Sequence, residues 1–376
     1  MGLIFSNGFD HLFPEARQFG FPRWHHRAPA LEGTSGRGGG ARLNVYVSGG
    51  HELGLDDEED AGGQVDVDVA GDLWIGQYIA APGTAEFSSG DGIACLAGLY
   101  IDGVRALTLW ANFASSENDG LAAHAIALKA GDAEIRTSNN ATPAAGTTLA
   151  VSDPGVFSAA GGTSGSAHLI LGIIRGEGSG RVQVLVDGDL ALDQDGIDEL
   201  DVNEGPFTKV AFEWAGSINA VSHRRQTFDD LWIADEVSLG DARCLIRTTE
   251  AQGSYSDGIP TGEAAGWEAV GDIPPNMSSY ITMAGGDRDS HLYEDGPDGD
   301  RAAVVGVTVR SVLTNPDFDL AVFHRDGGTD REVGELPAEV VADSTRFVAI
   351  PENPATEERW TLADLDGVEF GYEVKP

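Results

Sequence analysis

The sequence predicts an all-β protein composed of two consecutive β-sandwich domains. Short runs rich in Val, Ile, Leu and aromatic residues recur between clusters of Gly, Asp, Asn and Pro, which is the pattern of many strands joined by turns. Helical periodicity is almost absent. The length of 376 residues exceeds the usual size of one domain, so we expect two domains rather than one.

We place the first domain at residues 1–238. Its best strand candidates are runs of β-branched, aliphatic and aromatic residues bounded by turn residues. They cover residues 64–69, 72–80, 105–112, 124–129, 168–175, 181–186, 208–214 and 228–234. In the first run, Val65, Val67 and Val69 alternate with Asp66 and Asp68. This alternation predicts a buried row of valines opposite a solvent-facing row of aspartates.

Two Asp-Gly pairs predict tight β-hairpins in this domain. The strand 181–186 ends at Asp187-Gly188, and an alternating pattern resumes in residues 189–192. Asp102-Gly103 repeats the arrangement upstream. Asp-Gly tolerates the positive φ angles that a two-residue connection requires. Closely spaced hairpins of this kind favour a sandwich over an α/β fold.

We place the second domain at residues 239–376, because the pattern breaks near Ser238 and a second series of strand candidates follows. These candidates cover residues 241–247, 280–283, 302–311, 319–325, 345–350 and 368–374. Two short helical turns are expected, at residues 12–17 and 361–365, and Thr361 is placed to cap the second one.

The charge of the chain excludes several classes of partner. The formal net charge is −38, and only three of the 23 basic residues are lysines, namely Lys129, Lys209 and Lys375. Nucleic acids and anionic membranes are therefore not expected as partners. Two interpretations of the acidity remain open. It either keeps the protein soluble through self-repulsion or suits a high-salt, marine or halophilic setting, and the shortage of lysine supports the second.

The sequence shows no targeting segment and no disulfide framework. It contains no run of 18 apolar residues, and residues 1–8 lack the basic and long apolar regions of a signal peptide. We therefore expect that an extracellular role is reached by assembly and lysis. Cys95 and Cys244 lie far apart in apolar contexts, so we expect two buried thiols.

Residues 1–238 resemble the jelly roll of the concanavalin A or laminin-G type that occurs in many phage structural proteins. The resemblance rests on four landmarks in the family's order. They are NGFDH at 7–11, GRGGGARL at 36–43, the Val-Asp-Gly hairpin at 186–188 and the strand FDDLWI at 228–233. The resemblance implies a concanavalin A-like sandwich for the first domain.

Residues 239–376 resemble a β module that often follows such a domain in virion proteins of tailed phages. The matching stretches include LGDAR at 239–243, DIPPN at 272–276, DRDSHLY at 287–293 and residues 360–371. The resemblance implies a structural protein of the virion, on the tail or the capsid surface. Such a subunit works in many copies, so its expected partners are other copies of itself and other virion proteins.

Two functions follow from the resemblance, and the sequence leaves both open. The favoured one is a tail fibre or spike-like appendage that binds a glycan on the host surface. The alternative is a capsid decoration or cement protein that stabilises the head. A glycan-degrading depolymerase is a minor alternative.

Enzymatic chemistry is not expected. Glycosidases need two carboxylates at a fixed separation. The closest acidic alternation, Asp66 and Asp68, lacks the second Glu that such enzymes of concanavalin-like fold carry. The chain also contains no Gly-x-Ser-x-Gly elbow, no phosphate-binding loop and no dinucleotide fingerprint. We therefore predict a non-enzymatic protein.

Acidic clusters are candidates for Ca²⁺, which binds oxygen ligands. The first choice is Asp295, Asp298 and Asp300, whose intervening glycines allow a tight loop, and a second is the acidic run at residues 56–60. Solvated acidic turns are the alternative at both places. We expect Asp229 and Asp230 to cap backbone N–H groups rather than bind metal. No other cofactor is predicted.

The remaining site candidates are aromatic and histidine residues. Adjacent residues of a strand point to opposite faces, so His25 and His26 cannot chelate zinc from an extended segment. Most of the seven tryptophans lie in alternating strands and are expected in the core. Trp24 lies in a polar segment instead, and we expect Trp24, His25 and His26 to contact a glycan or a neighbouring subunit.

Overall fold

The computed structural model describes residues 3–7, 23–25, 30–32, 42–47, 62–80, 93–112, 117, 120–131, 147–157, 166–213, 224–235, 238–240, 242, 244, 247–271, 278–295, 304, 306–313, 318–336 and 344–376. The chain divides into two compact units. Unit 1 comprises Gly20–Arg243 with Met1, and unit 2 comprises Cys244–Pro376 with Gly2–Phe19.

The division between the units lies a few residues beyond the boundary predicted near Ser238. The N-terminal segment, which the sequence placed in the first domain, groups with unit 2 instead. Within that unit, a Cβ atom at Gly306 would lie 2.7 Å from the Leu3 side chain, which shows how closely strand β1 (Leu3–Asn7) packs there.

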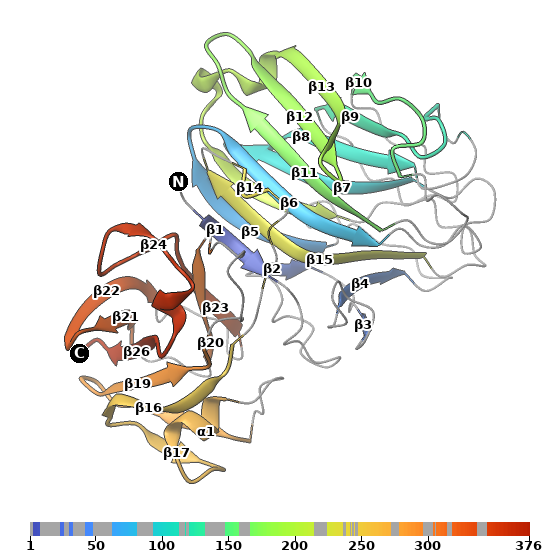
Figure 1. Ribbon diagram of the computed structural model, residues 1–376. Coiled ribbons are helices and arrows are strands. Elements are labelled where there is room, and N and C mark those ends of the chain that lie inside the picture. The colour runs from blue at the N-terminus through green and yellow to red at the C-terminus, as the bar shows by residue number, and fades with distance from the viewer. Residues whose placement is uncertain are drawn as a thin grey trace. The chain divides into compact units, whose positions relative to one another are not determined.

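Unit 1 contains two antiparallel sheets (Figure 1). Sheet A contains, in spatial order, β13 (Asp189–Ile197), β12 (Gly180–Val186), β11 (Ser166–Ile174), β6 (Leu73–Ala80), β15 (Arg224–Asp235), β4 (Arg42–Val47) and β3 (Ala30–Glu32). Sheet B contains β10 (Thr147–Val151), β9 (Ile126–Ala130), β8 (Val104–Asn112), β7 (Ile93–Ile101), β14 (Phe207–Glu213), β5 (Gly62–Val69) and β2 (Arg23–His25).

The chain crosses repeatedly between the two sheets. It passes from β5 in sheet B to β6 in sheet A, and later from β14 in sheet B to β15 in sheet A. The strands of these two crossings pair with each other, β5 with β14 and β6 with β15. The expected all-β class, a sandwich of two sheets followed by a smaller β domain, is confirmed. That the sandwich is a jelly roll of the concanavalin A type stays what the sequence resemblance implies.

Strand alternation builds the core between the sheets. Val65, Val67 and Val69 of β5 are buried, whereas Asp66 and Asp68 are exposed, as the sequence predicts. Strand β12 alternates in the same way between buried and half-buried positions. Each such strand contributes one apolar face to the core and leaves the other for polar or functional side chains.

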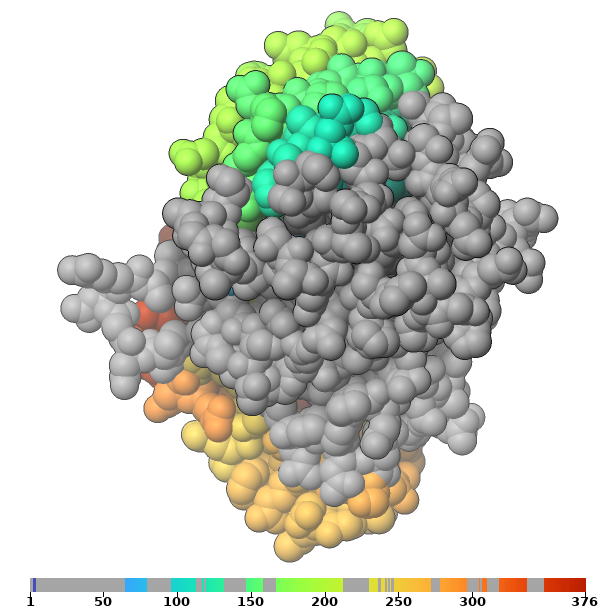
Figure 2. All heavy atoms as spheres, turned by 90° about the vertical axis from the view of Figure 1, so that its right-hand side faces the viewer, coloured from blue at the N-terminus to red at the C-terminus, as the bar shows by residue number. Residues whose placement is uncertain are grey.

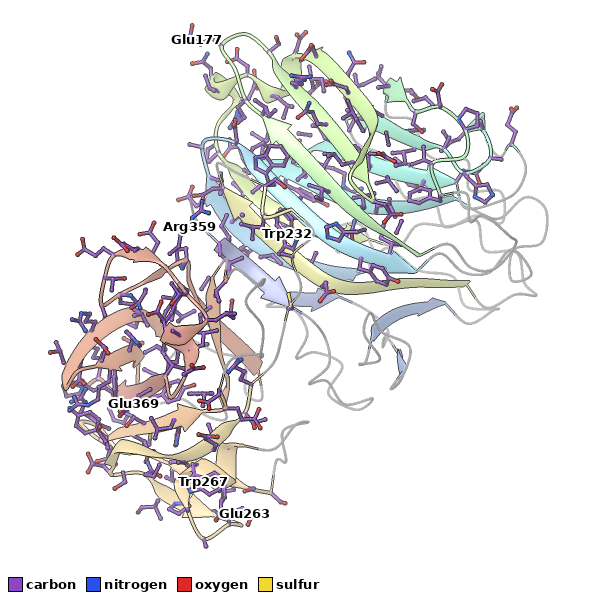
Figure 3. The ribbon with its side chains drawn as sticks, in the orientation of Figure 1. Glu177, Trp232, Glu263, Trp267, Arg359 and Glu369 are labelled. Carbon is purple, nitrogen blue, oxygen red and sulfur yellow. The ribbon has the colours of Figure 1, made fainter. Side chains whose placement is uncertain are left out.

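Two glycines of sheet A make room for tryptophan rings on the side of the sheet opposite the core. A Cβ atom at Gly76 would lie 2.0 Å from the indole of Trp232, and one at Gly172 would lie 2.3 Å from the ring of Trp74. The register pairs Gly76 with Trp232 and Gly172 with Trp74 on neighbouring strands. Trp232, labelled in Figure 3, is 1% exposed.

The hairpin predictions are confirmed. Asp102-Gly103 has φ angles of 48° and 78°, and Asp187-Gly188 has φ angles of 52° and 89°, which are the left-handed angles of a type I′ turn. The expected strand runs of unit 1 lie within strands β5, β6, β8, β9, β11, β12, β14 and β15, with shifts of one or two residues at several ends. Strand β10 was not predicted, and β7 was predicted only as the first arm of the Asp102-Gly103 hairpin.

Strand β13 lies at one edge of sheet A and strand β10 at one edge of sheet B, and these two strands contact each other. Figure 2 shows that the teal and green segments between residues 120 and 200 reach the surface on this side of unit 1.

Unit 2 is built around a five-stranded antiparallel sheet in the order β16 (Thr249–Ser256), β19 (Arg288–Tyr293), β26 (Glu369–Val374), β21 (Leu320–Asp326) and β22 (Thr329–Leu336). The antiparallel pair of β20 (Val307–Leu313) and β23 (Ser344–Ile350), which are separated in the chain by β21 and β22, packs against it. Smaller pairs are β17 (Ile259–Thr261) with β18 (Tyr280–Thr282) and β24 (Glu352–Asn353) with β25 (Glu358–Arg359). Figure 1 shows these elements in yellow to red.

The core of unit 2 lies between the five-stranded sheet and the β20–β23 pair. It contains Val322 and Phe370 from the sheet, Val309 and Val348 from the pair, and Trp360 from the C-terminal segment. The predicted strand 302–311 begins only at Val307. Of the predicted strand 241–247, the described residues form none.

Helix is confined, among the described residues, to α1 (Gly266–Val270) and three single 3₁₀ turns: η1 (Asp198–Leu200), η2 (Val202–Glu204) and η3 (Ala363–Leu365). The capping role of Thr361 is confirmed, since its Oγ1 accepts from the Asp364 N–H at 3.3 Å and its own N–H donates to Asp364 Oδ2 at 2.6 Å. The helical turn expected at residues 12–17 lies outside the described residues. The described helices include none long and apolar enough to span a membrane.

The cysteine prediction needs correction at one position. Cys244 is half-buried rather than fully buried, because it lies where the chain passes between strands instead of inside a sheet. Cys95 lies in strand β7, but its side chain is outside the described residues.

Candidate functional site

The outer face of sheet B carries basic and aromatic side chains. On the core side of β14, β7 and β8, Val210, Leu99 and Leu107 are at most 1% exposed. At the next positions in register, Lys209 of β14 lies opposite Tyr100 of β7, and Tyr100 lies opposite Arg105 of β8. Each of these two pairings lies beside a β-bulge. A bulge re-aims the side chains next to it. The three side chains therefore meet away from the apolar core.

Tyr100 lies at the centre of this group. Arg105 donates from Nε and Nη2 to the Tyr100 hydroxyl at 3.0 and 2.6 Å. The ammonium nitrogen of Lys209 lies 3.9 Å from the centroid of the same ring, within the range of a cation–π contact. Tyr100 and Arg105 are only 6% and 8% exposed, whereas Lys209 is half-buried. The ring thus supports one buried cation and one cation that remains partly accessible.

A second group extends this face to strand β9. Thr108 of β8 pairs with Lys129 of β9. The indole Nε1 of Trp110 donates to Thr108 Oγ1 at 2.8 Å, and the Lys129 ammonium lies 6.0 Å from the Trp110 ring. The buried Trp110 also packs with Leu121 and Ala127, which holds its ring in place. Lys129, like Lys209, is half-buried above an aromatic side chain.

We call Lys209, Tyr100, Arg105 and Lys129 the cationic row. It contains two of the three lysines of a chain whose net charge is −38. Strands β7, β8, β9 and β10 contain no Asp or Glu at all. The exposed Asp66 and Asp68 of β5 lie on the same side of the sheet, beyond Lys209. Among the strands that the structure describes here, the row thus lies on strands without carboxylates, next to the carboxylates of β5.

The cationic row presents N–H donors rather than a reactive group. The Lys209 ammonium forms no ion pair with any carboxylate that the structure describes. Amines held on a rigid strand scaffold can donate to hydroxyl, carboxylate or sulfate oxygens of a ligand. Because the rings beneath them are buried, the amines and not the ring faces are the contacts offered to solvent.

Unit 2 contains a different cluster, which we call the arginine network: Tyr255, Arg288, Arg325, Asp330 and Glu369. Asp330 accepts from the Tyr255 hydroxyl at 2.6 Å, from Arg288 Nη2 at 2.9 Å, and from Arg325 Nη1. The Arg288 guanidinium also stacks 3.8 Å from the centroid of the Tyr255 ring.

Serines connect the arginine network to Glu369, labelled in Figure 3. Ser290 Oγ donates to Glu369 Oε1 at 2.7 Å, and Ser254 Oγ donates to Oε2 at 3.0 Å while accepting from Arg325 Nε at 2.9 Å. Burial alone would raise the pKa of Asp330, but the hydrogen bonds from Tyr255, Arg325 and Arg288 outweigh it and lower that pKa to about 2. The network neutralises its own charges and ties β16, β19, β21, β22 and β26 together.

Two histidines are buried on the core side of the same sheet. The register places His291 and His324 on either side of Phe370, and they are 1% and 3% exposed. His291 Nε2 lies 3.4 Å from Asp289 Oδ1, and the His324 ring packs edge-on against Trp360. Burial lowers the pKa of His291, and attraction to Asp289 and Glu369 only partly offsets it. Among the described residues, neither histidine belongs to a group of three or more His, Cys, Asp or Glu that could hold a metal ion.

The predicted calcium ligands are only partly within the described chain. Asp295 is exposed just after β19, whereas Asp298 and Asp300 lie outside the described residues, as does the acidic run 56–60. The described residues include no group of three or more His, Cys, Asp or Glu that could hold a metal ion. The calcium site at Asp295, Asp298 and Asp300 stays a prediction. Asp230 is buried at a β-bulge of β15 with φ of 46°, and its capping role also stays a prediction.

The predicted contact residues Trp24 and His25 lie in β2 at the edge of sheet B, where they pair with Gly63 and Gly62 of β5. Their side chains and the whole of His26 lie outside the described residues, so their contact with a glycan stays a prediction. Trp110, Trp232 and Trp360 are buried, at most 3% exposed. The expected core role is confirmed for Trp360 in unit 2, whereas Trp232 and Trp110 are buried on the faces of sheets A and B opposite the core between the sheets.

Sequence reasoning missed the cationic row. The available signal was the position of Lys129 and Lys209 inside largely apolar strand candidates, in a chain that has only three lysines. Strand β7 was predicted only as the first arm of the Asp102-Gly103 hairpin, and no local pattern gives the sheet order that places Tyr100 beside Lys209.

Comparisons with solved structures show partial similarity to carbohydrate-active and lectin-like proteins. An endo-β-1,4-glucuronan lyase from the fungus Trichoderma reesei aligns with a TM-score of 0.38 and 10% identity over 62% of this chain and 95% of the lyase. A legume lectin-like domain from Entamoeba histolytica aligns with a TM-score of 0.30 and 11% identity over 52% of this chain and 84% of the domain.

The CBM2 module of the evolved Dit protein from Lactobacillus casei BL23 phage J-1 aligns with a TM-score of 0.29 and 10% identity over 55% of this chain and 74% of the module. Because these TM-scores are below 0.5, the similarities carry no argument about function. No protein-family model and no curated protein sequence matches the chain.

Proposed function

We propose that this protein is a non-enzymatic, glycan-binding subunit of a surface appendage on a tailed virus particle. The observation that carries the proposal is the cationic row, which offers fixed N–H donors on the outer face of a rigid sheet. Two amines supported by buried rings on neighbouring strands give a preorganised binding surface, and preorganisation reduces the entropy lost on binding. The virion setting rests on the sequence resemblance of both domains.

The arrangement favours binding over catalysis. Arg105 donates to the Tyr100 hydroxyl and both side chains are buried, so neither is presented to a substrate as an acid or base. Asp66 and Asp68, the exposed carboxylates that the structure describes on β5 on this side of the sheet, belong to one strand and flank the row rather than face each other across it. A glycan-degrading activity would need a pair on opposite sides of the bond that is cut.

Two experiments test this proposal. The full-length protein is applied to a glycan array, and immunogold electron microscopy with an antibody against it locates the copies on particles. We expect glycan binding and label at the tail. Label distributed over the head together with no array binding would overturn the appendage function in favour of capsid decoration. Release of shortened glycan during the incubation would overturn the non-enzymatic part.

A further inference from the structure

We infer that the outer face of the β17–β18 pair in unit 2 binds the ring of a neutral sugar. The inference goes beyond the proposed function, because it places a second ligand contact on unit 2 and does not depend on the cationic row. It is carried by two apolar side chains, Ile259 and Tyr280, which are 67% and 46% exposed on strands that contain no charged residue.

The register of the pair places these two side chains next to each other. Ile259 lies opposite Thr282, and Thr261 lies opposite Tyr280, so the four residues point to the same face, and all four are exposed. Diagonal neighbours of an antiparallel pair have Cβ atoms about 7 Å apart, which lets Ile259 and Tyr280 form one surface. The face is therefore a two-by-two arrangement in which apolar residues occupy one diagonal and threonines the other.

The opposite face of the pair packs against the rest of unit 2. A Cβ atom at Gly258 would lie 2.4 Å from Ile281 Cγ2, and one at Gly266, the first residue of α1, would lie 3.3 Å from Ile281 Cδ1. The Gly258 N–H also donates to Oδ2 of the buried Asp289 at 3.1 Å. Figure 1 shows β17 and α1 next to each other at one end of unit 2. A two-stranded ribbon alone is only marginally stable, so this packing fixes the outer face before a ligand binds.

The size of the exposed face favours a small ligand over a second copy of the chain. A fully covered aromatic side chain buries roughly 150–250 Å², so a tyrosine that is 46% exposed offers on the order of 100 Å². The smaller but more exposed Ile259 adds a similar area. A stable protein interface needs about 800 Å² on each partner. The face is several times too small for a stable dimer, and it suits a single sugar ring.

The mixture of groups favours a neutral sugar among small ligands. The C–H groups on the face of a sugar ring pack on apolar side chains, and the hydroxyls at its rim can bond to Thr261 and Thr282. A purely apolar ligand would cover the threonine hydroxyls without giving them a partner. An anionic ligand would be repelled by a chain of net charge −38, in which the exposed Glu263, labelled in Figure 3, lies two residues beyond Thr261.

Matched aromatic variants of the full-length protein test the inference. Tyr280→Ala removes the ring from the face. Phe318→Ala is the control, because it removes a ring that is also 46% exposed in unit 2 but lies beside Gly285, outside the β17–β18 pair. Wild type and variants are applied to an array of neutral and acidic glycans, and each glycan that binds is then titrated in solution.

We expect the wild type to bind at least one neutral glycan, and Tyr280→Ala to weaken that binding by at least about tenfold. Phe318→Ala should bind as the wild type does, and Tyr280→Trp, which keeps a ring at the position, should retain binding. Circular dichroism and thermal unfolding confirm that each variant is folded.

The outcomes separate failure of the inference from failure of the proposed function. Glycan binding that the variant Lys129→Gln with Lys209→Gln loses and Tyr280→Ala keeps would overturn the inference alone. Binding of no glycan on the array would overturn both. Equal weakening by the two alanine variants, or an effect of Tyr280→Ala on acidic glycans only, would also overturn the inference. A dimer that Tyr280→Ala converts to a monomer in light scattering would assign the face to a second copy instead.

Discussion

The cationic row of unit 1 and the arginine network of unit 2 use the same side-chain types for opposite purposes. In both, guanidinium groups contact a tyrosine at its ring and its hydroxyl. In unit 2, Asp330 accepts hydrogen bonds from both arginines and Glu369 forms an ion pair with Arg325, so the charges are neutralised inside the network. In unit 1, strands β7 to β10 supply no carboxylate.

The difference teaches that the acceptor, and not the cation, decides what an arginine and tyrosine cluster does in this protein. A network that contains its own anions joins strands and stabilises the unit. In the cationic row, the described strands β7 to β10 contribute a phenol and an indole as the partners of the cations and no carboxylate. The predictions below test this distinction, beginning with the largest expected effect.

Removing the central acceptor of unit 2 should cause the largest loss of stability. Asp330→Asn leaves Arg288, Arg325 and Tyr255 without a charged acceptor, and we expect unit 2 to lose about 2 kcal/mol of unfolding free energy. Hydrogen exchange in urea, followed separately in peptides of each unit, measures it. Asp193→Asn, which removes the exposed partner of Arg181 on the surface of unit 1, is the matched control and should change nothing measurable.

Acid should reproduce this loss without mutation. The pKa of Asp330 lies at about 2 in the folded protein and near 3.8 in its ordinary state, so the folded state binds the proton less readily. The stabilisation is therefore present above pH 3.8 and is lost as the pH falls from there toward 2. Hydrogen exchange of unit 2 across this range should show the loss in the wild type, and Asp330→Asn should lack this step.

Removing the hydroxyl at the centre of the cationic row should have a smaller effect. Tyr100→Phe keeps the ring under Lys209 but takes away the oxygen that accepts from Arg105, and we expect a loss of about 1 kcal/mol in unit 1. Urea unfolding measures the stability. A loss of stability as large as that of Asp330→Asn would contradict the distinction between the two clusters.

The buried histidines should give the smallest effect, a weakening of unit 2 in mild acid. Burial lowers the pKa of His291 and of His324, so the unfolded state takes up protons first as the pH drops below about 6.5. Their contribution to stability is complete above that pH and falls below it. Asp289, Glu369, Asp326 and Asp364 favour the charged forms and limit the loss, while Arg331 opposes them.

The replacement His324→Phe tests this prediction, because it keeps an aromatic ring beside Trp360 and Phe370. The urea midpoint of unit 2 should fall between pH 7.5 and 5 in the wild type and fall less in the variant. A midpoint that rises on acidification would mean that the carboxylates around the histidines outweigh their burial.

The sequence predicts the fold better than the site, for physical reasons. Period-two alternation in strands such as β5 and β12 and the φ requirement of Asp-Gly are local properties, and both are confirmed. The cationic row depends on which strands become neighbours. Lys209 and Tyr100 are over one hundred positions apart along the chain and meet because β14 inserts between β7 and β5.

The same limit applies to unit 2. His291 and His324 look scattered in the sequence, and only the order β19, β26 and β21 places them on either side of Phe370. The grouping of the N-terminal segment with unit 2 was missed for a similar reason. No local pattern in residues 2–19 indicates the contact of Leu3 with Gly306.

The uncharged outer face of β17 and β18 has a consequence for how fast a ligand arrives. At a distance, an approaching anion meets the field of the whole acidic chain and is repelled, whereas a neutral sugar arrives by diffusion alone. Dissolved salt shortens the reach of that field to about 8 Å at physiological strength, which matters to the anion only. The association rate of a neutral sugar should therefore stay constant as salt is added, whereas that of an acidic glycan should rise.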